Sequence, residues 1–254
     1  MSTDLELALR LADAADSVTM ERFRAANLQV DRKLDASPVT DADTRTERAL
    51  RDILERERPG HAVVGEEFGE TGDASLRWYL DPIDGTVNYA RGVPVWATLI
   101  ALRDAGEPLC AVVSAPALRR RWWAARDEGA FADGLRLHVS SVAALEDAYL
   151  STTDRRDLAP RGFEAGYIDV EARCLTVRAL GDFWGHMLVA EGAIDVAVDP
   201  VAAPWDLAPI QLIVEEAGGR FSDLTGRRVI DGGHALSTNG ALHDRVVRML
   251  APAG

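Results

Sequence analysis

The spacing of apolar side chains predicts two amphipathic helices at the start of the chain. The first is expected over residues 5–23, where apolar residues recur at helical intervals, namely Leu5, Leu9, Ala12, Val18 and Phe23. The second is expected from Asp41 to Glu57, with Thr40 or Asp41 as its N-cap. Both helices keep one polar face, so we expect each of them to cover a core from outside.

After residue 60 the hydrophobic period shortens to that of strands. Strands are expected in residues 61–67 and 76–82, in a hairpin over 95–116 that turns at Asp104-Ala105-Gly106, and in 120–134. Beyond residue 140, strand-like segments at 147–152, 174–180 and 193–199 alternate with helical ones at 183–192, 204–218 and 242–251. This alternation indicates an α/β fold. A boundary near Ser140 would divide the chain into an α+β half, residues 1–140, and an α/β half, residues 141–254.

Composition narrows the class of protein. The chain has 254 residues, of which 47% are hydrophobic, so it can bury a full core as one large domain or two smaller ones. No apolar run approaches the roughly 18 residues of a membrane span, and the acidic N-terminus is unlike a secretory leader. Two isolated cysteines cannot form a disulfide framework. We therefore expect a cytoplasmic enzyme with no membrane partner.

The net charge of −13 argues against a nucleic-acid partner, because affinity for phosphate backbones comes mainly from clustered lysines and arginines. Lys33 is the only lysine of the chain. A phosphate substrate would therefore require positive charge from bound cations.

Acidic residues stand at four separated places where an apolar element ends. These are PVTDAD with Asp41 and Asp43, GEE with Glu66 and Glu67, DPIDGT with Asp81 and Asp84, and PWD with Asp206. For Asp41 a helix cap is at least as good an explanation as function. Glu66 and Asp81 follow strand interiors, and ligand sites of open sheets form at strand ends. Pro82 donates no backbone hydrogen bond, so we expect the strand to stop there and to turn the Ile83 carbonyl and Asp84 toward one point.

Carboxylates that converge repel one another and must either take up protons or bind cations. No His or Cys occurs in these motifs, and all-oxygen ligands suit a hard ion such as Mg²⁺. Gly85 and Thr86 follow at once and are expected to open a helix or a tight turn whose N–H groups attract an anion. The four motifs together predict metal-assisted phosphoryl transfer on a small phosphate ester.

These motifs resemble the inositol monophosphatase-like family of Mg²⁺-dependent, lithium-sensitive phosphatases. The segments that carry the resemblance are residues 38–43, 65–67, 78–86, 205–206 and 216–219, and they follow the order of the family. The resemblance spans residues 33 to 219, nearly the whole chain. It implies a layered αβαβα sandwich with mixed sheets, a homodimer, and two to three Mg²⁺ ions per subunit.

The resemblance also implies the roles of individual residues. Glu66, Asp81 and the Ile83 carbonyl would hold a first metal ion; Asp81, Asp84 and Asp206 would hold a second; a third, weaker ion would bind near Glu66. Catalytic roles fall on Asp43, Thr86 and Glu66, with Asp43 and Thr86 orienting and deprotonating the attacking water. Glu67 would support the metal ligands from outside. The backbone N–H groups of Gly85 and Thr86 would bind the phosphate.

Three positions depart from the common family pattern without removing a metal ligand. Phe68 stands where many relatives have Ser, Tyr89 replaces a common Phe, and Pro209 interrupts a run of small residues. We expect Pro209 in the first turn of its helix, where proline is tolerated.

Substrate selection is expected in the C-terminal half, on Gly181, Asp182, Phe183 and Asp199. The Gly-Asp-aromatic sequence at 181–183 is similar to the histidinol-phosphatase branch of the family, whereas the inositol branch commonly shows Gly-Thr/Ser-Ala. Acids at Asp182 and Asp199 suit a substrate that carries an ammonium and an imidazole. They could also bind the hydroxyl groups of inositol. Trp184 could pack in the core or line a pocket. His186 could lie on a helix surface or line a pocket.

The sequence therefore favours a histidinol-phosphate phosphatase. An inositol-1-monophosphatase, with fructose-1,6-bisphosphatase side activity, is the second hypothesis. A catalytically silent binding or regulatory protein of the same fold is the third, and the presence of all the expected metal ligands argues against it.

Overall fold

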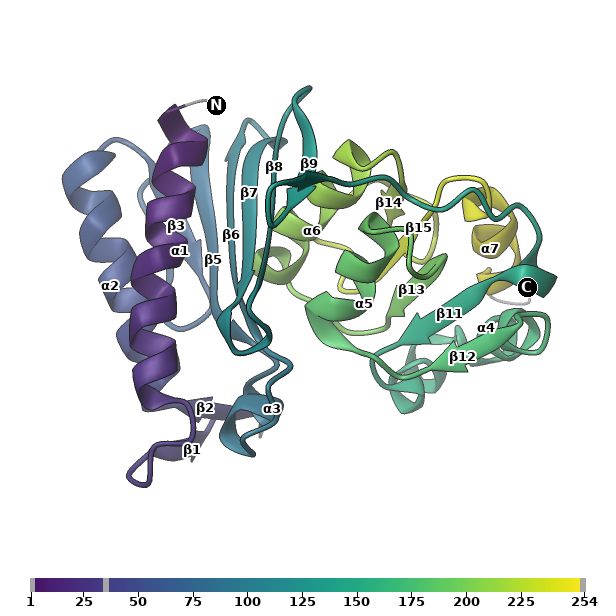
Figure 1. Ribbon diagram of the computed structural model, residues 1–254, viewed down its shortest axis with the longest axis horizontal. Helices are drawn as coiled ribbons and strands as arrows, with labels where there is room; N and C mark the ends of the chain where they lie inside the picture. Colours follow the sequence, from purple (N-terminus) through teal and green to yellow (C-terminus); the bar gives the residue numbers. More distant parts are fainter. Residues whose placement is uncertain (1–2, 34–36, 252–254) are drawn as a thin grey trace.

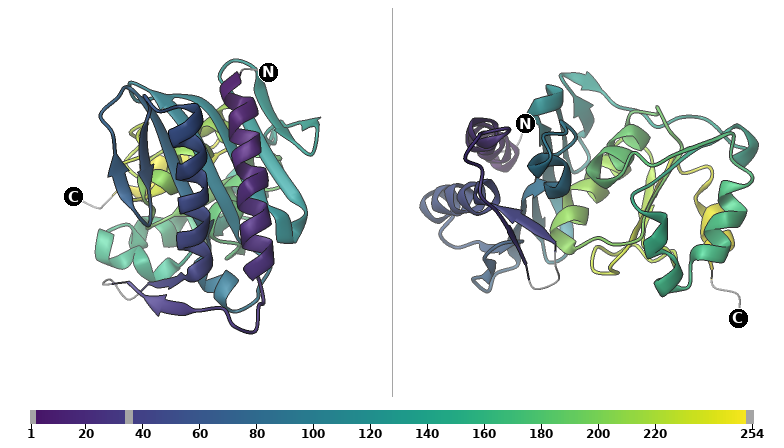
Figure 2. Two further views of the ribbon diagram at one scale, coloured as in Figure 1. Left: turned by 90° about the vertical axis from the view of Figure 1, so that its left-hand side faces the viewer. Right: turned by 90° about the horizontal axis from the view of Figure 1, so that it is seen from below.

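The computed structural model of the protein describes residues 3–33 and 37–251. Helices and sheets alternate in five layers, in the order αβαβα (Figure 1). This is the layered αβαβα architecture that the family resemblance implied. Figure 2 shows the two N-terminal helices side by side on the outer face of the larger sheet.

The first layer consists of α1 (Thr3–Arg22) and α2 (Asp41–Glu57), close to the predicted ranges. Thr40 is the N-cap of α2: its hydroxyl accepts a hydrogen bond from the N–H of Ala42, and Asp43 accepts one from the N–H of Thr40. The apolar faces of both helices pack on the sheet in a buried cluster that includes Leu11, Leu50 and Trp78. The predicted amphipathic helices therefore lie where their apolar stripes are buried.

The second layer is an eight-stranded mixed sheet in the order β10-β9-β8-β7-β6-β5-β3-β4. Its strands are β3 (Ala62–Gly65), β4 (Gly69–Thr71), β5 (Leu76–Asp84), β6 (Ala97–Asp104), β7 (Glu107–Ala115), β8 (Arg120–Ala125), β9 (Gly129–Ala132) and β10 (Leu135–Arg136). The predicted hairpin is confirmed, since β6 and β7 pair antiparallel. The prediction that β5 ends at Pro82 is wrong. The strand continues to Asp84, because a register shift against β6 between Asp81 and Asp84 accommodates the proline.

The third layer consists of α5 (Asp182–Ala190) and α6 (Pro204–Glu216), which pack between the two sheets. The expected position of Pro209 in the first turn is wrong, because α6 begins at Pro204 and Pro209 lies in its interior. At that position proline removes the hydrogen bond to the carbonyl of Trp205. It is Pro204 that occupies the favourable first helical position.

The fourth layer is a five-stranded sheet in the order β12-β11-β13-β15-β14, and α4 and α7 form the fifth layer beside it. Its elements are β11 (Tyr149–Thr152), β12 (Thr176–Arg178), β13 (Val196–Asp199), β14 (Arg220–Ser222), β15 (Ala235–Thr238), α4 (Glu164–Glu171) and α7 (His243–Leu250). A small separate sheet pairs β1 (Val30–Arg32) with β2 (Pro38–Thr40), and α3 (Thr86–Ala90) follows β5. The helix α4 was not predicted; its N-cap, Phe163, makes no side-chain capping bond that would mark the start.

The eight-stranded sheet uses residues 62–136 and the five-stranded sheet uses residues 149–238. The core between them is continuous: one buried cluster includes Leu99 and Trp122 of the first sheet, Phe183 of α5 and Ile213 of α6. The division near residue 140 stays a prediction. In the described part of the chain, no helix combines the length and the apolar character that a membrane span requires.

Candidate active site

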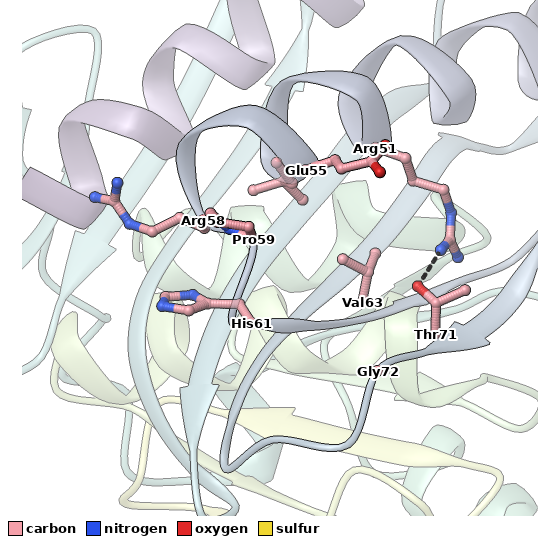
Figure 3. A pocket seen from close by; sticks show the side chains of 9 residues that line it. Arg51, Glu55, Arg58, Pro59, His61, Val63, Thr71 and Gly72 are labelled. Carbon is pink, nitrogen blue, oxygen red and sulfur yellow. Dashed lines mark hydrogen bonds between the residues drawn. The ribbon is translucent and has the colours of Figure 1, made fainter.

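The acidic motifs do not lie in the largest cavities of the protein. One cavity of about 360 Å³ lies between the C-terminal end of α2 and the β3–β4 hairpin (Figure 3). Its arginines already have acidic partners, since Arg51 pairs with Glu47 at 2.7 Å and Arg58 with Asp4 at 2.8 Å. Glu55 is the one acid among the lining residues, so the cavity has no excess of acids that would hold a cation.

A cavity of about 220 Å³ lies where the expected site residues meet. It is lined by Glu66 from the end of β3, by Gly85 and Thr86 at the start of α3, and by Asp182 at the start of α5. The remaining lining residues are Ser37, Pro38, Val87 and Asn88. Segments from both halves of the sequence thus meet at one depression.

The two acids of the DPIDGT motif are held by backbone N–H groups. Asp81 is 2% exposed and accepts a hydrogen bond from the N–H of Ile83 at 2.9 Å. Asp84 accepts one from the N–H of Phe183 at 2.7 Å, which ties β5 to the start of α5. Desolvation, together with repulsion from neighbouring acids such as Asp206, raises the pKa of both carboxyl groups well above the ordinary value. Both carboxylates therefore gain by meeting a cation.

Asp206 comes from the first turn of α6 and accepts a hydrogen bond from the N–H of Ala203 at 2.8 Å. Desolvation raises its pKa to about 7, and repulsion from Glu66 acts in the same direction. The acids that repel one another therefore come both from the eight-stranded sheet and from α6.

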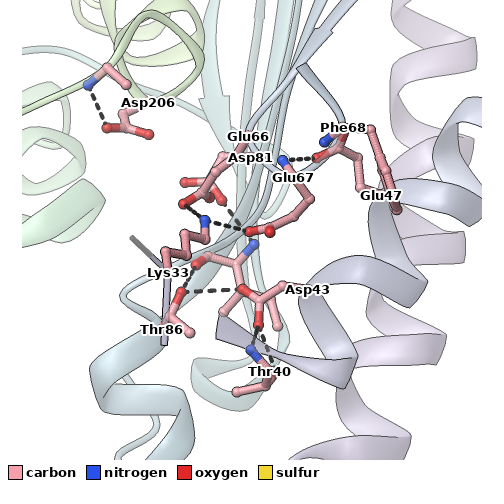
Figure 4. A network of polar contacts seen from close by, with 12 residues as sticks. Lys33, Thr40, Asp43, Glu47, Glu66, Glu67, Phe68, Asp81, Thr86 and Asp206 are labelled. Carbon is pink, nitrogen blue, oxygen red and sulfur yellow. Dashed lines mark hydrogen bonds and ion pairs between the residues drawn. The ribbon is translucent and has the colours of Figure 1, made fainter. Parts of the chain in front are cut away.

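Glu66 and Glu67 share the only lysine of the chain (Figure 4). The ammonium nitrogen of Lys33 lies 2.6 Å from Glu66 Oε1 and 2.7 Å from Glu67 Oε1. Burial raises the pKa of Glu67 to about 7, although its hydrogen bond with Lys33 acts in the opposite direction. A protein cation thus already neutralises part of this acidic cluster.

Asp43 and Thr86 lie side by side at the floor of the site. The hydroxyl of Thr86 is 3.2 Å from Asp43 Oδ1 and donates to the Ile83 carbonyl at 2.9 Å. The other oxygen of Asp43 accepts from the N–H of Thr40 at 2.8 Å and from its hydroxyl at 2.6 Å. Burial raises the pKa of Asp43 to about 6, so this carboxylate can accept a proton near neutral pH.

The backbone at Gly85 requires glycine. Its φ is +81°, and a β-carbon there would lie 3.2 Å from the carbonyl oxygen of Val95 and 3.3 Å from Asp182 Oδ2. Glycine therefore lets the start of α3 lie close to Val95 and Asp182. This placement is compatible with an anion approaching Gly85 and Thr86.

In residues 3–33 and 37–251, no three Asp, Glu, His or Cys side chains converge tightly enough to ligate one metal ion. Desolvation raises the pKa values of Asp81, Asp84 and Asp206, and the carboxylates still lie close enough for repulsion between them to raise these pKa values further. Their chemistry nevertheless fits a hard cation. The donors are all oxygens, and Asp81, Asp84 and Asp206 form no ion pair with the described residues.

Among the residues expected to select the substrate, the structure places the two acids in or near the site and the ring of Phe183 in the core. Asp182 faces the cavity, with Oδ2 3.5 Å from the amide nitrogen of Asn88, and Gly181 supplies the turn that places it. Asp199 lies at the end of β13, and burial raises its pKa to about 8, with repulsion from Asp206 also contributing. Phe183 differs from the expectation: its ring packs on Trp122 in the core, and only its N–H reaches the site.

His186 is 1% exposed, which rules out a helix-surface position. Its Nδ1 lies 2.7 Å from the hydroxyl of Ser237 and its Nε2 4.0 Å from Asp199 Oδ2. Burial lowers the pKa of His186 to about 4, so the ring is neutral at physiological pH. The ring therefore packs behind Asp199 as a neutral neighbour.

The sequence analysis missed Glu47, which positions the GEE loop. Glu47 is fully buried in α2, and its carboxylate accepts hydrogen bonds from the N–H groups of Glu67 at 2.6 Å and Phe68 at 3.3 Å. A signal was present, since Glu47 follows Asp43 by four residues and therefore lies on the same, inward face of the helix. The contact of Lys33 with Glu66 had no comparable signal.

Comparisons with known proteins find relatives that match nearly the whole chain. A model described as the inositol monophosphatase family matches residues 1–252. A histidinol-phosphatase of Mycobacterium tuberculosis is 52% identical over 253 residues, 97% of each chain. One from Streptomyces coelicolor is 48% identical over 256 residues, 97% of this chain and 96% of the relative. Among solved structures, an inositol monophosphatase from Zymomonas mobilis superposes with a TM-score of 0.87 at 33% identity, covering 98% of this chain and 99% of that one.

Proposed function

Because this chain belongs to the inositol monophosphatase family, we propose that it is a Mg²⁺-dependent phosphate monoester hydrolase that converts L-histidinol phosphate and water to L-histidinol and phosphate. The observation that carries the substrate is the identity of about half of all residues with two histidinol-phosphatases over nearly the full chain. Mg²⁺ as the ion, sensitivity to lithium, a homodimeric assembly and a cytoplasmic location belong to the same proposal.

The proposed metal ligands are carboxylates from three motifs and one backbone carbonyl, all near the end of β5. Glu66, Asp81 and the Ile83 carbonyl would hold a first ion, Asp81, Asp84 and Asp206 a second, and Glu66 would contribute to a third, weaker one. Bound Mg²⁺ would supply the positive charge that acidifies water and neutralises the phosphate dianion and the leaving alkoxide. Glu67, fixed by Glu47, would hold Glu66 and Lys33 in place.

The chain's own residues would perform the proton transfer and the positioning. Thr86 donates to the Ile83 carbonyl, so its oxygen can accept a hydrogen bond from a water that lies beside both Thr86 and Asp43. Asp43, with a pKa raised to about 6 by burial, would take the proton that this water loses as it attacks phosphorus. The N–H groups of Gly85 and Thr86 would hold the phosphate oxygens in line for that attack.

Asp182 and Asp199 would recognise the amino alcohol. Both carboxyl groups have raised pKa values, chiefly because they are desolvated, and Asp182 borders the same cavity as Gly85. A desolvated acid gains from a cationic partner such as the ammonium of histidinol and pays a penalty without one. A site of this kind should therefore discriminate against neutral polyols.

The test compares kcat/KM at fixed Mg²⁺ for histidinol phosphate, inositol 1-phosphate, fructose 1,6-bisphosphate and phosphoadenosine phosphate. Histidinol phosphate is expected to lead inositol 1-phosphate by at least about tenfold, the equivalent of about 1.4 kcal/mol for one unpaired polar group. Asp182→Asn is expected to narrow that ratio, whereas Asp73→Asn, in an exposed loop after β4, should leave it unchanged. A higher kcat/KM for inositol 1-phosphate would support the inositol-1-monophosphatase alternative.

A further inference from the structure

Another cavity adjoins the inner face of the eight-stranded sheet, away from the acidic site. Its volume is about 410 Å³, within the range of small-molecule sites, and it lies between β3, β5, β6 and the start of α6. Three arginines line it, Arg77, Arg103 and Arg228, and the other charged lining residues are two acids, Glu70 and Asp231. Arg77 precedes Asp81 by four residues on β5, so the cavity lies about 13 Å along the strand from the acidic site.

Two of these arginines stand directly opposite each other. Arg77 of β5 and Arg103 of β6 are register partners in an antiparallel pair, so their side chains share one face of the sheet. Like charges at directly opposed positions destabilise a sheet. Arg77 is relieved by an ion pair with Glu70 at 2.6 Å, and Arg228 by pairs with Glu215 at 2.7 Å and Glu107 at 3.3 Å.

Arg103, in contrast, forms no ion pair with a carboxylate of the described residues. It is 6% exposed, and its guanidinium donates to the side-chain oxygen of Gln211 at 2.8 Å and to the Gly106 carbonyl. Its Nε is buried and has no hydrogen-bond partner within residues 3–33 and 37–251. Glu107 and Glu215 act on Arg103 only from beyond ion-pair distance, and a buried charge without a carboxylate in direct contact costs free energy that a bound anion would lower.

We propose that this cavity is a binding site for a small oxyanion, a carboxylate or a phosphate group, held by Arg103 with Arg77 and Arg228 at its rim. A planar guanidinium suits both groups, because its N–H donors match two oxygens at once. In the cavity of Figure 3 both arginines, Arg51 and Arg58, are paired with acids, so neither is a buried guanidinium without a carboxylate partner as Arg103 is. The site requires no metal ion and does not depend on the proposed enzymatic function.

The test titrates the full-length protein in EDTA with inorganic phosphate, sulfate and succinate by isothermal titration calorimetry. Without Mg²⁺ the acidic site repels anions, so binding there is suppressed. We expect saturable binding of one anion per chain. Tighter binding of phosphate and sulfate than of succinate would indicate a phosphate-type ligand, and the reverse order would indicate a carboxylate. Arg103→Gln is expected to weaken the binding at least tenfold, and Arg77→Gln, at a partly exposed position, provides a second variant if Arg103→Gln does not fold.

Arg58→Gln is the matched control, since it removes an arginine from the other cavity, and it should bind the anion as the unaltered protein does. Three results would each overturn the proposal: no saturable binding of any of the three anions, unchanged affinity in folded Arg103→Gln and Arg77→Gln, or an equal loss in Arg58→Gln. Catalytic rates enter none of these measurements, so a failure here and a failure of the proposed hydrolase function are distinguishable.

Discussion

Chelation of Mg²⁺ with EDTA is expected to abolish phosphate ester hydrolysis, and added Mg²⁺ is expected to restore it. The acids around Asp81 leave the site negative, and Lys33 is the cation that the structure places against them. A phosphate dianion would be repelled from such a site. Hydrolysis measured before chelation, after it, and after readdition of Mg²⁺ tests the requirement. Full activity in EDTA would exclude a metal-assisted mechanism.

The same treatment should lower thermal stability. A ligand present at 100 times its Kd stabilises the folded state by about 2.7 kcal/mol, and in a protein of this size each kcal/mol shifts Tm by about 2–4 °C. Removal of Mg²⁺ should therefore lower Tm by roughly 5–10 °C. The unfolding curve followed by circular dichroism with and without EDTA provides this second measurement, and an unchanged Tm would contradict tight ion binding in the folded state.

Local patterns were sufficient to predict the elements on which the acidic site is built. The period-two pattern located β5 and the β6–β7 hairpin, and the capping residues at Thr40 located the start of α2. Short elements without such signals were missed, including α4, which lacks a side-chain cap, and the edge strand β4, whose residues are all exposed. The prediction that Pro209 lies in the first turn of its helix was wrong, because the helix begins at Pro204.

Contacts between distant segments set the limit of sequence reasoning at the site. Acids at strand ends could be recognised one motif at a time, because each motif is local. The approach of Asp182 to Gly85 depends instead on how α5 docks against β5, and the contact of Lys33 with Glu66 and Glu67 depends on the path of the chain before β2. Phe183 illustrates the same limit, since packing on Trp122 turned its ring into the core.

Asp206→Asn and Asp84→Asn are each expected to lower kcat by more than about 100-fold. Loss of a residue that only supports a metal ligand costs up to about 100-fold, and loss of the ligand itself should cost more. Both side chains belong to the proposed second ion site, and both have raised pKa values because they are desolvated and repelled by other acids. Neither change should disturb the local fold. An asparagine oxygen can still accept the hydrogen bond from Ala203 or from Phe183. In EDTA both variants should melt at a higher temperature than the unaltered protein, because each removes one repulsive charge.

Asp223→Asn is the control with the opposite expectation. Although desolvation acts against it, hydrogen bonds from Thr225 and Arg227 lower the pKa of Asp223, so its charge stabilises the fold. Its loss should cost about 1–3 kcal/mol of stability and leave kcat unchanged. Turnover and unfolding temperature, measured for all three variants with saturating Mg²⁺ and with EDTA, separate a ligand from a structural carboxylate. Near-normal turnover in both Asp206→Asn and Asp84→Asn would mean that the second ion site is misassigned, since a carboxylate that binds the ion cannot be replaced by a neutral amide without loss.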